Sequence, residues 1–336
     1  MTEGAVKIRL LNGFDDQHIT PDIWNSLLEN GNSDVVFLTW HWQKAWWDIF
    51  GRGKLLLLVA EKDDIPVAIA PLFEDGGMIF FTGSGGSDYL DFIGNINDIY
   101  ILQSILEFAV ATVTKFVGFR FYHIPEASST PTKLEAVAAQ AGWQFYDEGE
   151  LAAPAMDLTN SEYVVEAINK KSLIRHESWF KNNGLLNVEH LSKSIDILPN
   201  LNAFFNQHIN RWARTDFPSL FLDNTQQRFY QHLVNGSSET EWLRFTRVTW
   251  NNHPIAFHFG FNYKGNYLWY KPSFDIEFSK RSPGEVLLKQ LFLHAVAEGA
   301  HTFDFGLGDE AFKSRFATKR IMVHTWGMYP DENTKG

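Results

Sequence analysis

Four consecutive residues, Ser282-Pro283-Gly284-Glu285, combine the signature of a helix start with a place where phosphate could bind. Serine, then proline in the first turn, then glutamate three residues after the serine is typical of a capped helix N-terminus. The first turn of a helix leaves backbone N–H groups without partners, and such groups bind anions. Because Pro283 has no N–H, the candidate donors are those of Gly284, Glu285 and Val286. We predict a site for a phosphorylated ligand formed by Arg281, Ser282, Gly284, Glu285 and Val286.

The residues around this turn predict the elements that position it. Leu287, Leu291 and Ala295 recur at helical spacing, and Gly299 is a natural stop, so we expect a helix over 283–298. Before it, two strands over 255–263 and 267–271 are joined by a short turn. After it, the apolar run over 303–308 is typical of a buried strand.

Hairpin, turn, helix and returning strand follow one another as in the core of the GCN5-related N-acyltransferases (GNAT), where the pyrophosphate of acyl-CoA rests on the turn. Several segments also resemble the bacterial acetyltransferase family associated with cellulose and exopolysaccharide biosynthesis, a relative of the FemAB-type peptidyltransferases. The segments are Phe37–Trp40, Ser87–Asp91, Pro254–Phe257, Tyr270–Asp275, Ser282–Glu285 and Asp304–Glu310 with Lys313 and Phe316.

This resemblance, which covers about residues 35–320, implies an α+β chain of tandem GNAT-like domains with mixed β-sheets flanked by helices. We expect an N-terminal domain over 1–160 that lacks a phosphate-binding helix start, and a C-terminal domain over 161–330 that binds acyl-CoA. The resemblance implies an acyltransferase that uses acetyl-CoA or another acyl-CoA, without a metal. The acceptor would be an amine of a sugar or small metabolite, possible substrates of cell-surface polysaccharide biosynthesis, received between the domains.

Amide formation from acyl-CoA requires a neutral amine, a path for its proton and donors that polarise the thioester carbonyl. Asp304 interrupts an apolar strand, where burial favours the protonated form and makes a carboxylate more basic, so it is our candidate base. Lys313 could polarise the carbonyl or bind an anionic acceptor, and His258 is an alternative base. A structural ion pair for Asp304, a surface position for Lys313 and a structural role for His258 are the competing interpretations.

Four further residues are candidates for acceptor binding through the resemblance. They are Asp88, Tyr89, Asp91 and Tyr270. The tryptophans near them suggest sugar stacking, but Trp42 and Trp46 are spaced i and i+4, which favours core packing.

The chain also contains a short internal sequence repeat. Residues 62–69 and 250–257 both read as a polar hairpin turn, then Pro, a β-branched residue, Ala and a large apolar residue. The first copy continues into the glycine-rich loop 82–88, and its next helical pattern begins only near Asp98. We therefore expect two similar folds, with a phosphate-binding helix start in the second only.

A cluster of basic residues lies between the copies, in a segment that we predict to be a single helix over 163–183. Its members are Lys170, Lys171, Arg175, His176 and Lys181. Such a cluster could attract CoA phosphates or an anionic acceptor, or form an ordinary solvated helix face.

Composition excludes several other classes of protein. Of the 336 residues, 45% are hydrophobic and none is cysteine, which excludes disorder, disulfides and thiolate chemistry. No apolar run approaches the roughly 18 residues of a membrane helix, and the start of the chain has no signal-peptide layout, so we expect a cytoplasmic protein. A net charge of −11 argues against nucleic acid as a partner.

Two rival functions remain on the same fold. A FemAB-like aminoacyl transferase would use aminoacyl-tRNA, against which the net charge argues. A non-catalytic scaffold of a polysaccharide assembly would keep the fold and lose CoA binding. The sequence leaves the acyl group, the acceptor and the oligomeric state open.

Overall fold

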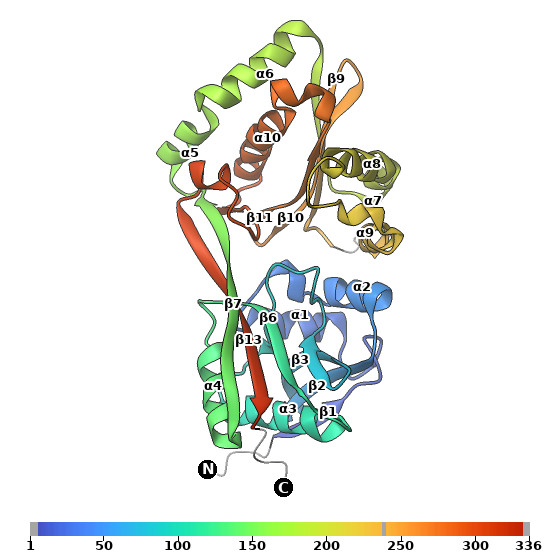
Figure 1. Cartoon of the computed structure of the whole chain (residues 1–336), viewed down its shortest axis with the longest axis vertical. Helices are drawn as coiled ribbons and strands as arrows, with labels where there is room; N and C mark the ends of the chain where they lie inside the picture. The colour runs from blue at the N-terminus through green and yellow to red at the C-terminus, as the bar shows by residue number, and fades with distance from the viewer. Residues whose placement is uncertain (1–5, 237–239, 332–336) are drawn as a thin grey trace. The chain divides into compact units, whose positions relative to one another are not determined.

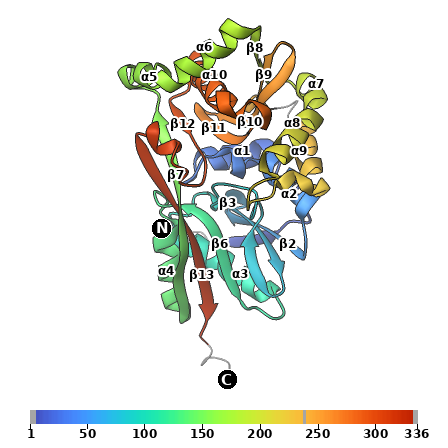
Figure 2. The ribbon, with the colours of Figure 1, turned by 45° about the horizontal axis from the view of Figure 1, so that its top comes forward.

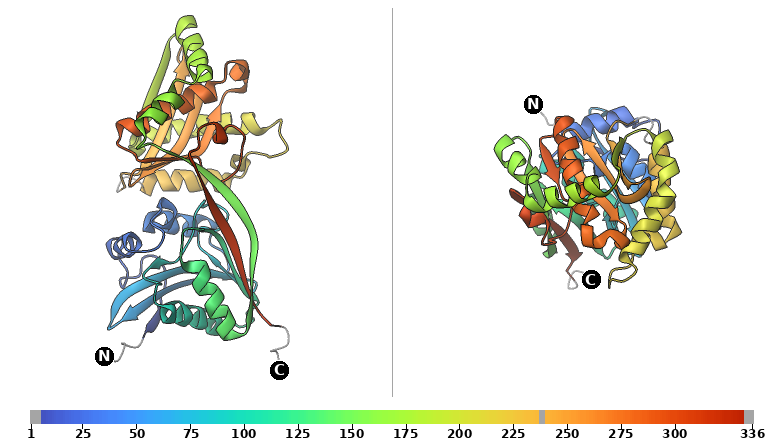
Figure 3. Two further views of the ribbon diagram at one scale, coloured as in Figure 1. Left: turned by 90° about the vertical axis from the view of Figure 1, so that its left-hand side faces the viewer. Right: turned by 90° about the horizontal axis from the view of Figure 1, so that it is seen from above.

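The computed structural model describes residues 6–236 and 240–331 and divides the chain into two compact units (Figure 1). Unit 1 consists of residues 1–152 and 321–336, and unit 2 of residues 153–320. These limits differ from the expected boundary at residue 160, because the last strand, β13 (Lys319–Pro330), returns to unit 1 beside β7 (Trp143–Asp157), as Figure 3 shows. Residues 1–5, on which the signal-peptide argument mainly rested, lie outside the described part.

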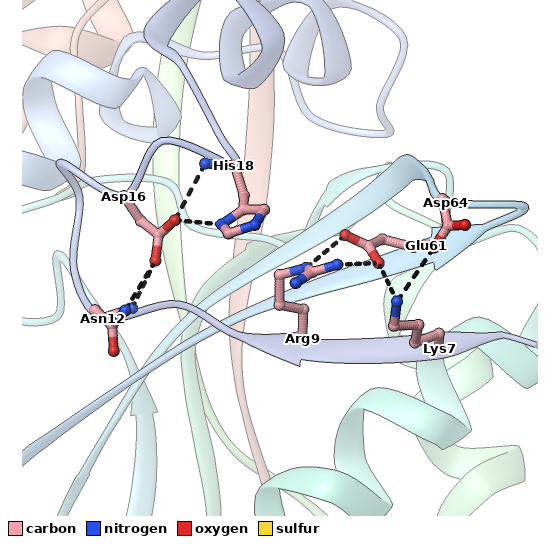
Figure 4. Close-up of polar contacts among 7 residues, drawn as sticks. All are labelled: Lys7, Arg9, Asn12, Asp16, His18, Glu61 and Asp64. Atoms are coloured by element: carbon pink, nitrogen blue, oxygen red, sulfur yellow. Dashed lines mark hydrogen bonds and ion pairs between the residues drawn. The ribbon is translucent and has the colours of Figure 1, made fainter.

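The sheet of unit 1 has the strand order β1-β2-β3-β4-β6-β13-β7, with β5 paired to β3. Its remaining strands are β1 (Lys7–Leu10), β2 (Lys54–Lys62), β3 (Ile65–Asp75), β4 (Met78–Phe81), β5 (Ile93–Gly94) and β6 (Gly118–Pro125). Its helices are α1 (Pro21–Glu29), α2 (Trp40–Phe50), α3 (Ile99–Thr112) and α4 (Thr130–Ala141). Arg9 on β1 ties this strand to β2, because its Nε and Nη2 donate to the Glu61 carboxylate at 2.7 and 3.1 Å (Figure 4).

Unit 2 contains a mixed sheet in the order β7-β12-β11-β10-β9-β8 (Figure 2). The strands are β8 (Leu186–Leu191), β9 (Leu243–Trp250), β10 (His253–Tyr263), β11 (Asn266–Phe274) and β12 (Thr302–Asp304). The helices are α5 (Ser161–Ile168), α6 (Lys171–Asn183), α7 (Ser194–Ile197), α8 (Leu201–Trp212), α9 (Asn224–Gly236) and α10 (Pro283–Ala297). Figure 1 shows α6 and α10 on one face of this sheet and α7–α9 on the other.

The two hairpins that carry the sequence repeat have the same backbone geometry. Asp63 and Asp64 in one turn and Asn251 and Asn252 in the other all have positive φ, between 50° and 66°. In both hairpins the register shifts by one residue directly beside the proline, with the β-branched residue as the extra one. The same bulge in the same place confirms the predicted repeat of this element.

Several predicted helices need new limits. The expected helix over 163–183 is two helices, because α5 ends at Ile168, where the Asn169 side chain donates to the Val165 carbonyl, and α6 begins at Lys171. Helix α10 lies within one residue of its predicted end, and Gly299 follows it with φ of 72°. The predicted strand over 303–308 is shorter, since β12 ends at Asp304.

Among the described residues no helix is both long and apolar enough to cross a membrane. In the same part of the chain, no group of three or more His, Cys, Asp or Glu side chains is arranged to hold a metal ion.

Candidate active site

The first turn of α10 does not have the predicted capping box. A capping serine needs an extended backbone, but Ser282 has φ of 48° and ψ of 61°, and its side chain makes no capping hydrogen bond. Glu285 points elsewhere and accepts a hydrogen bond at 2.8 Å from Nη1 of Arg315. A left-handed serine costs about 1 kcal/mol, and such strain is characteristic of functional turns.

This conformation reduces the set of backbone donors at the turn. The Ser282 carbonyl accepts from the N–H groups of Glu285 at 3.0 Å and Val286 at 3.3 Å. Among the described residues, the N–H of Gly284 has no hydrogen-bond partner. A Cβ atom at Gly284 would lie 3.2 Å from Cδ1 of Phe274, so this position suits a residue without a side chain. Of the three predicted donors, the structure leaves Gly284 available to a ligand.

Strands β11 and β12 separate beside this turn. They pair in parallel only from Asn266 with Thr302 to Leu268 with Asp304, whereas β11 continues to Phe274. The chain after β12 turns toward β7, since the Phe305 N–H donates to the Pro154 carbonyl. The separation leaves the second half of β11 without a strand on that side, and the opening can hold an extended chain.

A cavity of about 220 Å³ lies at this separation. Its wall is mainly apolar and comes from β11, the first turns of α10 and the segment after β12, with one arginine from α8. The lining residues are Arg211, Trp269, Pro272, Ser273, Phe274, Ser279, Ser282, Gly284, Glu285, Leu287, Leu288, Phe312, Arg315 and Phe316. This cavity, called the slot below, is narrow and mainly apolar, and the predicted turn at Ser282–Glu285 forms part of its wall.

Cationic side chains surround the turn. Arg315 contacts Glu285 and also donates to the Ser172 hydroxyl of α6 at 2.8 Å. The exposed Arg281 lies over the Trp179 ring with Cζ 4.4 Å from the centroid. His176 Nε2 is 3.8 Å from Glu285 Oε2, and burial, reinforced by nearby arginines, lowers the His176 pKa. This end of the slot thus carries one carboxylate and two arginines, which favours an anionic ligand.

The candidate residues Asp304 and Lys313 meet at the turn 306–308, directly after the point where β12 leaves β11. Asp304 is 1% exposed, and its Oδ1 accepts from the Gly306 N–H at 2.8 Å. The Lys313 ammonium, 3% exposed, donates to the carbonyls of residues 306, 307 and 308 at 3.3, 2.8 and 3.2 Å, and pairs with Glu310 at 2.7 Å. Lys313 is therefore not on the surface. Both side chains stabilise the turn 306–308, and Lys313 uses its donors in doing so. Neither side chain is among the described residues that line the slot.

His258 fills the bulge between β10 and β11. Its Nε2 accepts from the Tyr270 N–H at 3.3 Å, and a Cβ atom at Gly260 would lie 2.2 Å from its Cε1. The ring is fully buried, and burial lowers its pKa to about 3. This placement favours the structural interpretation of His258.

The other candidate of this region, Tyr270, is 7% exposed and faces α9. Its ring centroid lies 5.3 Å from that of Phe261, and the Lys271 ammonium lies 3.9 Å from it. The side chain of Tyr270 therefore does not line the slot.

The three candidates of unit 1 have different environments. Asp91 is fully buried, and its carboxylate accepts from the hydroxyls of Ser33, Ser128 and Thr130 at 2.6–2.7 Å. Burial raises its pKa, and it joins three segments of unit 1. This environment favours a structural role for Asp91, and a ligand contact from it stays a prediction. Tyr89 is 4% exposed, whereas Asp88 is half-buried.

Sequence reasoning missed Arg211 and Arg315 as parts of the site. Arg211 comes from α8 and Arg315 from the turn after Lys313, so both reach the slot from distant positions in the chain. No local pattern marks either residue. Phe316, in contrast, belonged to the family motif and does line the slot.

Comparison with known proteins identifies the domain that carries this site. Residues 170–314 match a family model described as acetyltransferase (GNAT) domain. The match contains α6, the strands β8–β12 and α10. No curated protein matches the sequence.

Solved structures resemble nearly the whole chain. FemX has a TM-score of 0.67 at 10% identity, covering 94% of this chain and 97% of its own. A conserved protein of unknown function from Bacteroides thetaiotaomicron has a TM-score of 0.61 at 13% identity, over 94% and 99%. A tandem GNAT protein from the clavulanic acid biosynthesis pathway has a TM-score of 0.53 at 12% identity, over 96% and 98%.

These findings establish the fold. Residues 170–314 match the GNAT domain model, and the chain as a whole has the predicted tandem GNAT-like fold, with mixed sheets flanked by helices. At such low identity the structural likeness extends to the fold alone.

Proposed function

We propose that the protein is an acyl-CoA-dependent N-acyltransferase, with acetyl-CoA as the first candidate donor. The observation that carries the proposal is the slot where β11 and β12 separate, which ends at the Gly284 N–H. The family resemblance supports an amine of a sugar or small metabolite as the acceptor. It also supports a cytoplasmic reaction that contributes to cell-surface polysaccharide biosynthesis.

The residues present fit the parts of acyl-CoA. The Gly284 N–H with Arg281 and Arg315 suits the pyrophosphate, because backbone donors at a helix start and guanidinium groups both bind phosphate oxygens. The apolar wall of Trp269 and Phe316 suits the pantetheine arm. Bound acyl-CoA would supply a thioester, whose carbonyl carbon the acceptor nitrogen attacks while the C–S bond breaks.

The protein must also take a proton from the amine. Asp304 remains our candidate base, because it lies where the two strands separate, and Lys313 is the positioning residue that holds the adjacent turn. His258 is the weaker alternative, since a buried histidine with a pKa of about 3 is a poor base near neutral pH. Acceptor contacts from Asp88 and Tyr89 remain predictions.

Calorimetric titration with a panel of acyl-CoAs, followed by mass analysis of amine acceptors, tests this function. Gly284→Asp places a carboxylate over the remaining donor and beside Phe274, so it should abolish acetyl-CoA binding in a folded protein. A matched control is Gly13→Asp, because a Cβ atom there meets nothing within 4 Å. Equal acetyl-CoA affinity of wild type and Gly284→Asp would remove the turn from the proposal.

Aminoacyl transfer is a second candidate, because the likeness to FemX extends over 94% of this chain. The same titrations performed with aminoacyl-tRNA distinguish the two donors. Binding of aminoacyl-tRNA without binding of any acyl-CoA would favour this alternative.

A further inference from the structure

A second cavity lies beside the slot and shares a wall with it. It encloses about 1000 Å³ between the C-terminal end of α8 and the segment that follows β11. Arg211, Phe274 and Ser279 line both cavities. The wide cavity is rich in polar side chains, among them Asn206 and Asn210, whereas the slot is mainly apolar.

The guanidinium of Arg211 is held between two aromatic rings. Its Cζ lies 5.0 Å from the ring centroid of Trp212 and 4.4 Å from that of Phe274. One of its five N–H groups is committed to protein, through Nη1 and the Pro272 carbonyl at 2.9 Å. The two rings contact the guanidinium, and its other N–H groups are left for hydrogen bonds to a ligand.

Arg211 has no carboxylate partner within ion-pair distance among the described residues. The nearby acid Asp275 lines the same cavity, but its Oδ2 pairs with His253 Nε2 at 2.7 Å. Burial lowers the Arg211 pKa to about 10, so the group still carries its charge at neutral pH. Glu310 acts on this charge from beyond ion-pair distance, and the half-buried guanidinium forms no ion pair with a described residue. Such an arrangement is unusual, because burial of a charge is costly unless a counter-charge compensates it.

The Trp212 side chain is a second polar group of the wide cavity with an N–H left unpaired among the described residues. Its Nε1 is buried and has no partner within the described part of the chain, although Trp212 lines the wide cavity. A ligand with oxygen acceptors could satisfy this donor and the Arg211 edge together.

We propose that the wide cavity receives the acceptor amine, and that Arg211 selects acceptors carrying a phosphate or carboxylate group. This inference rests on the proposed acyl transfer and names the chemical class of its acceptor. Arg211 then orients an anionic acceptor at the wall that the two cavities share.

Two matched pairs of acceptors test the proposal. Glucosamine 6-phosphate with glucosamine and lysine with 1,5-diaminopentane differ mainly by an acidic group. Wild type should bind and acylate the acidic member of at least one pair better than the neutral one. Arg211→Gln should lower this preference by about 10- to 100-fold, the effect of one charged hydrogen-bonded contact. Arg211→Lys should retain part of it, because lysine keeps the charge and loses the planar fork.

Controls separate the possible failures. Arg228→Gln changes the same charge at an exposed position of α9 outside both cavities, so it should leave the preference unchanged. Acetyl-CoA affinity, measured separately, should change by less than about twofold in Arg211→Gln. Loss of acetyl-CoA affinity with an intact acceptor preference would assign Arg211 to the donor phosphates and overturn the proposal. Equal binding of acidic and neutral members by wild type would also overturn it. Titration of the acceptor pairs without acetyl-CoA keeps this result separate from any failure of acyl-CoA binding itself.

Discussion

The ion pair of Glu285 and Arg315 gives two variants with opposite expected effects on donor binding. Its charges lie at the first turn of α10, 2.8 Å apart, with side chains 23% and 41% exposed. If the donor pyrophosphate binds at this turn, Glu285→Gln removes a repelling charge and releases Arg315. Arg315→Gln removes the attracting charge and the hydrogen-bonded partner of the Glu285 carboxylate.

The expected size follows from Coulomb's law. A unit charge about 6 Å from a phosphate contributes about 1.4 kcal/mol at an effective dielectric constant of about 40, which suits half-exposed groups. This corresponds to about a tenfold change in Kd. We therefore expect Glu285→Gln to bind acetyl-CoA about tenfold more tightly, and Arg315→Gln about tenfold more weakly, with both differences reduced in high salt.

Isothermal titration with acetyl-CoA at two salt concentrations provides the measurement. Glu298→Gln is the matched control, because Glu298 lies at the other end of the same helix. Their offset of 13 positions along the chain corresponds to about 20 Å of helix, beyond the Debye length of about 8–10 Å. If both test variants leave the Kd unchanged, or both weaken binding, the pair is purely structural and the electrostatic reasoning is refuted.

Two further predictions concern catalysis and pH. Asp304→Asn should lower turnover by about 10²-fold with unchanged acetyl-CoA affinity, and near-normal turnover of the folded variant would transfer proton removal to His258 or to solvent. Burial lowers the pKa of His190 to about 4 and of His208 and His258 to about 3, so these rings are neutral in the folded protein. Their contribution to stability is complete above the unfolded pKa of about 6.5 and is lost as pH falls toward 4, by up to about 1.4 kcal/mol per pH unit for each histidine. Urea unfolding at pH 7.5 and 5.5 should show this loss, and equal unfolding free energies would contradict it.

The sequence predicted the elements around the site because local signals set them. The α10 helix follows from an apolar stripe and a glycine stop, and the hairpins follow from polar two-residue turns. The capping box failed for a physical reason that a local pattern does not contain. Glu285 finds a charged partner in Arg315, thirty residues away, and Ser282 adopts a left-handed backbone.

The side chains in and near the slot also make contacts that local sequence patterns do not predict. Asp304 was predicted from its place within an apolar run and Lys313 from the family resemblance, yet their contacts with the turn 306–308 depend on where β12 ends. Arg211 reaches the slot from α8, across the sheet from α10, and its sequence neighbours are those of an ordinary helix end. Polar contacts between distant segments arise from the fold, so residue spacing alone does not predict them.

The two copies of the repeat explain why one unit carries the site. In unit 1 the parallel strands β4 and β6 and helix α3 follow the same order as β11, β12 and α10 in unit 2. The connection after β4 is the glycine loop, however, and it packs against α2. Trp42 Nε1 donates to the Ser87 hydroxyl at 2.9 Å, and a Cβ atom at Gly83 would lie 2.7 Å from that oxygen.

In unit 1, side chains therefore pack against the loop that corresponds to the turn before α10 in unit 2. Trp42 and Trp46 are buried beside the glycine loop, so they are core residues, as their spacing indicated, and not a sugar-stacking surface. Helix α3 begins only after this loop, with Asp98 as its cap, and a carboxylate at a helix start occupies the donors that an anion would need. In unit 2 the turn leads directly into α10, and Gly284 in its first turn lines the slot. Unit 1 thus has the sheet of the repeat without an open helix start, which supports the proposal that the donor binds to unit 2.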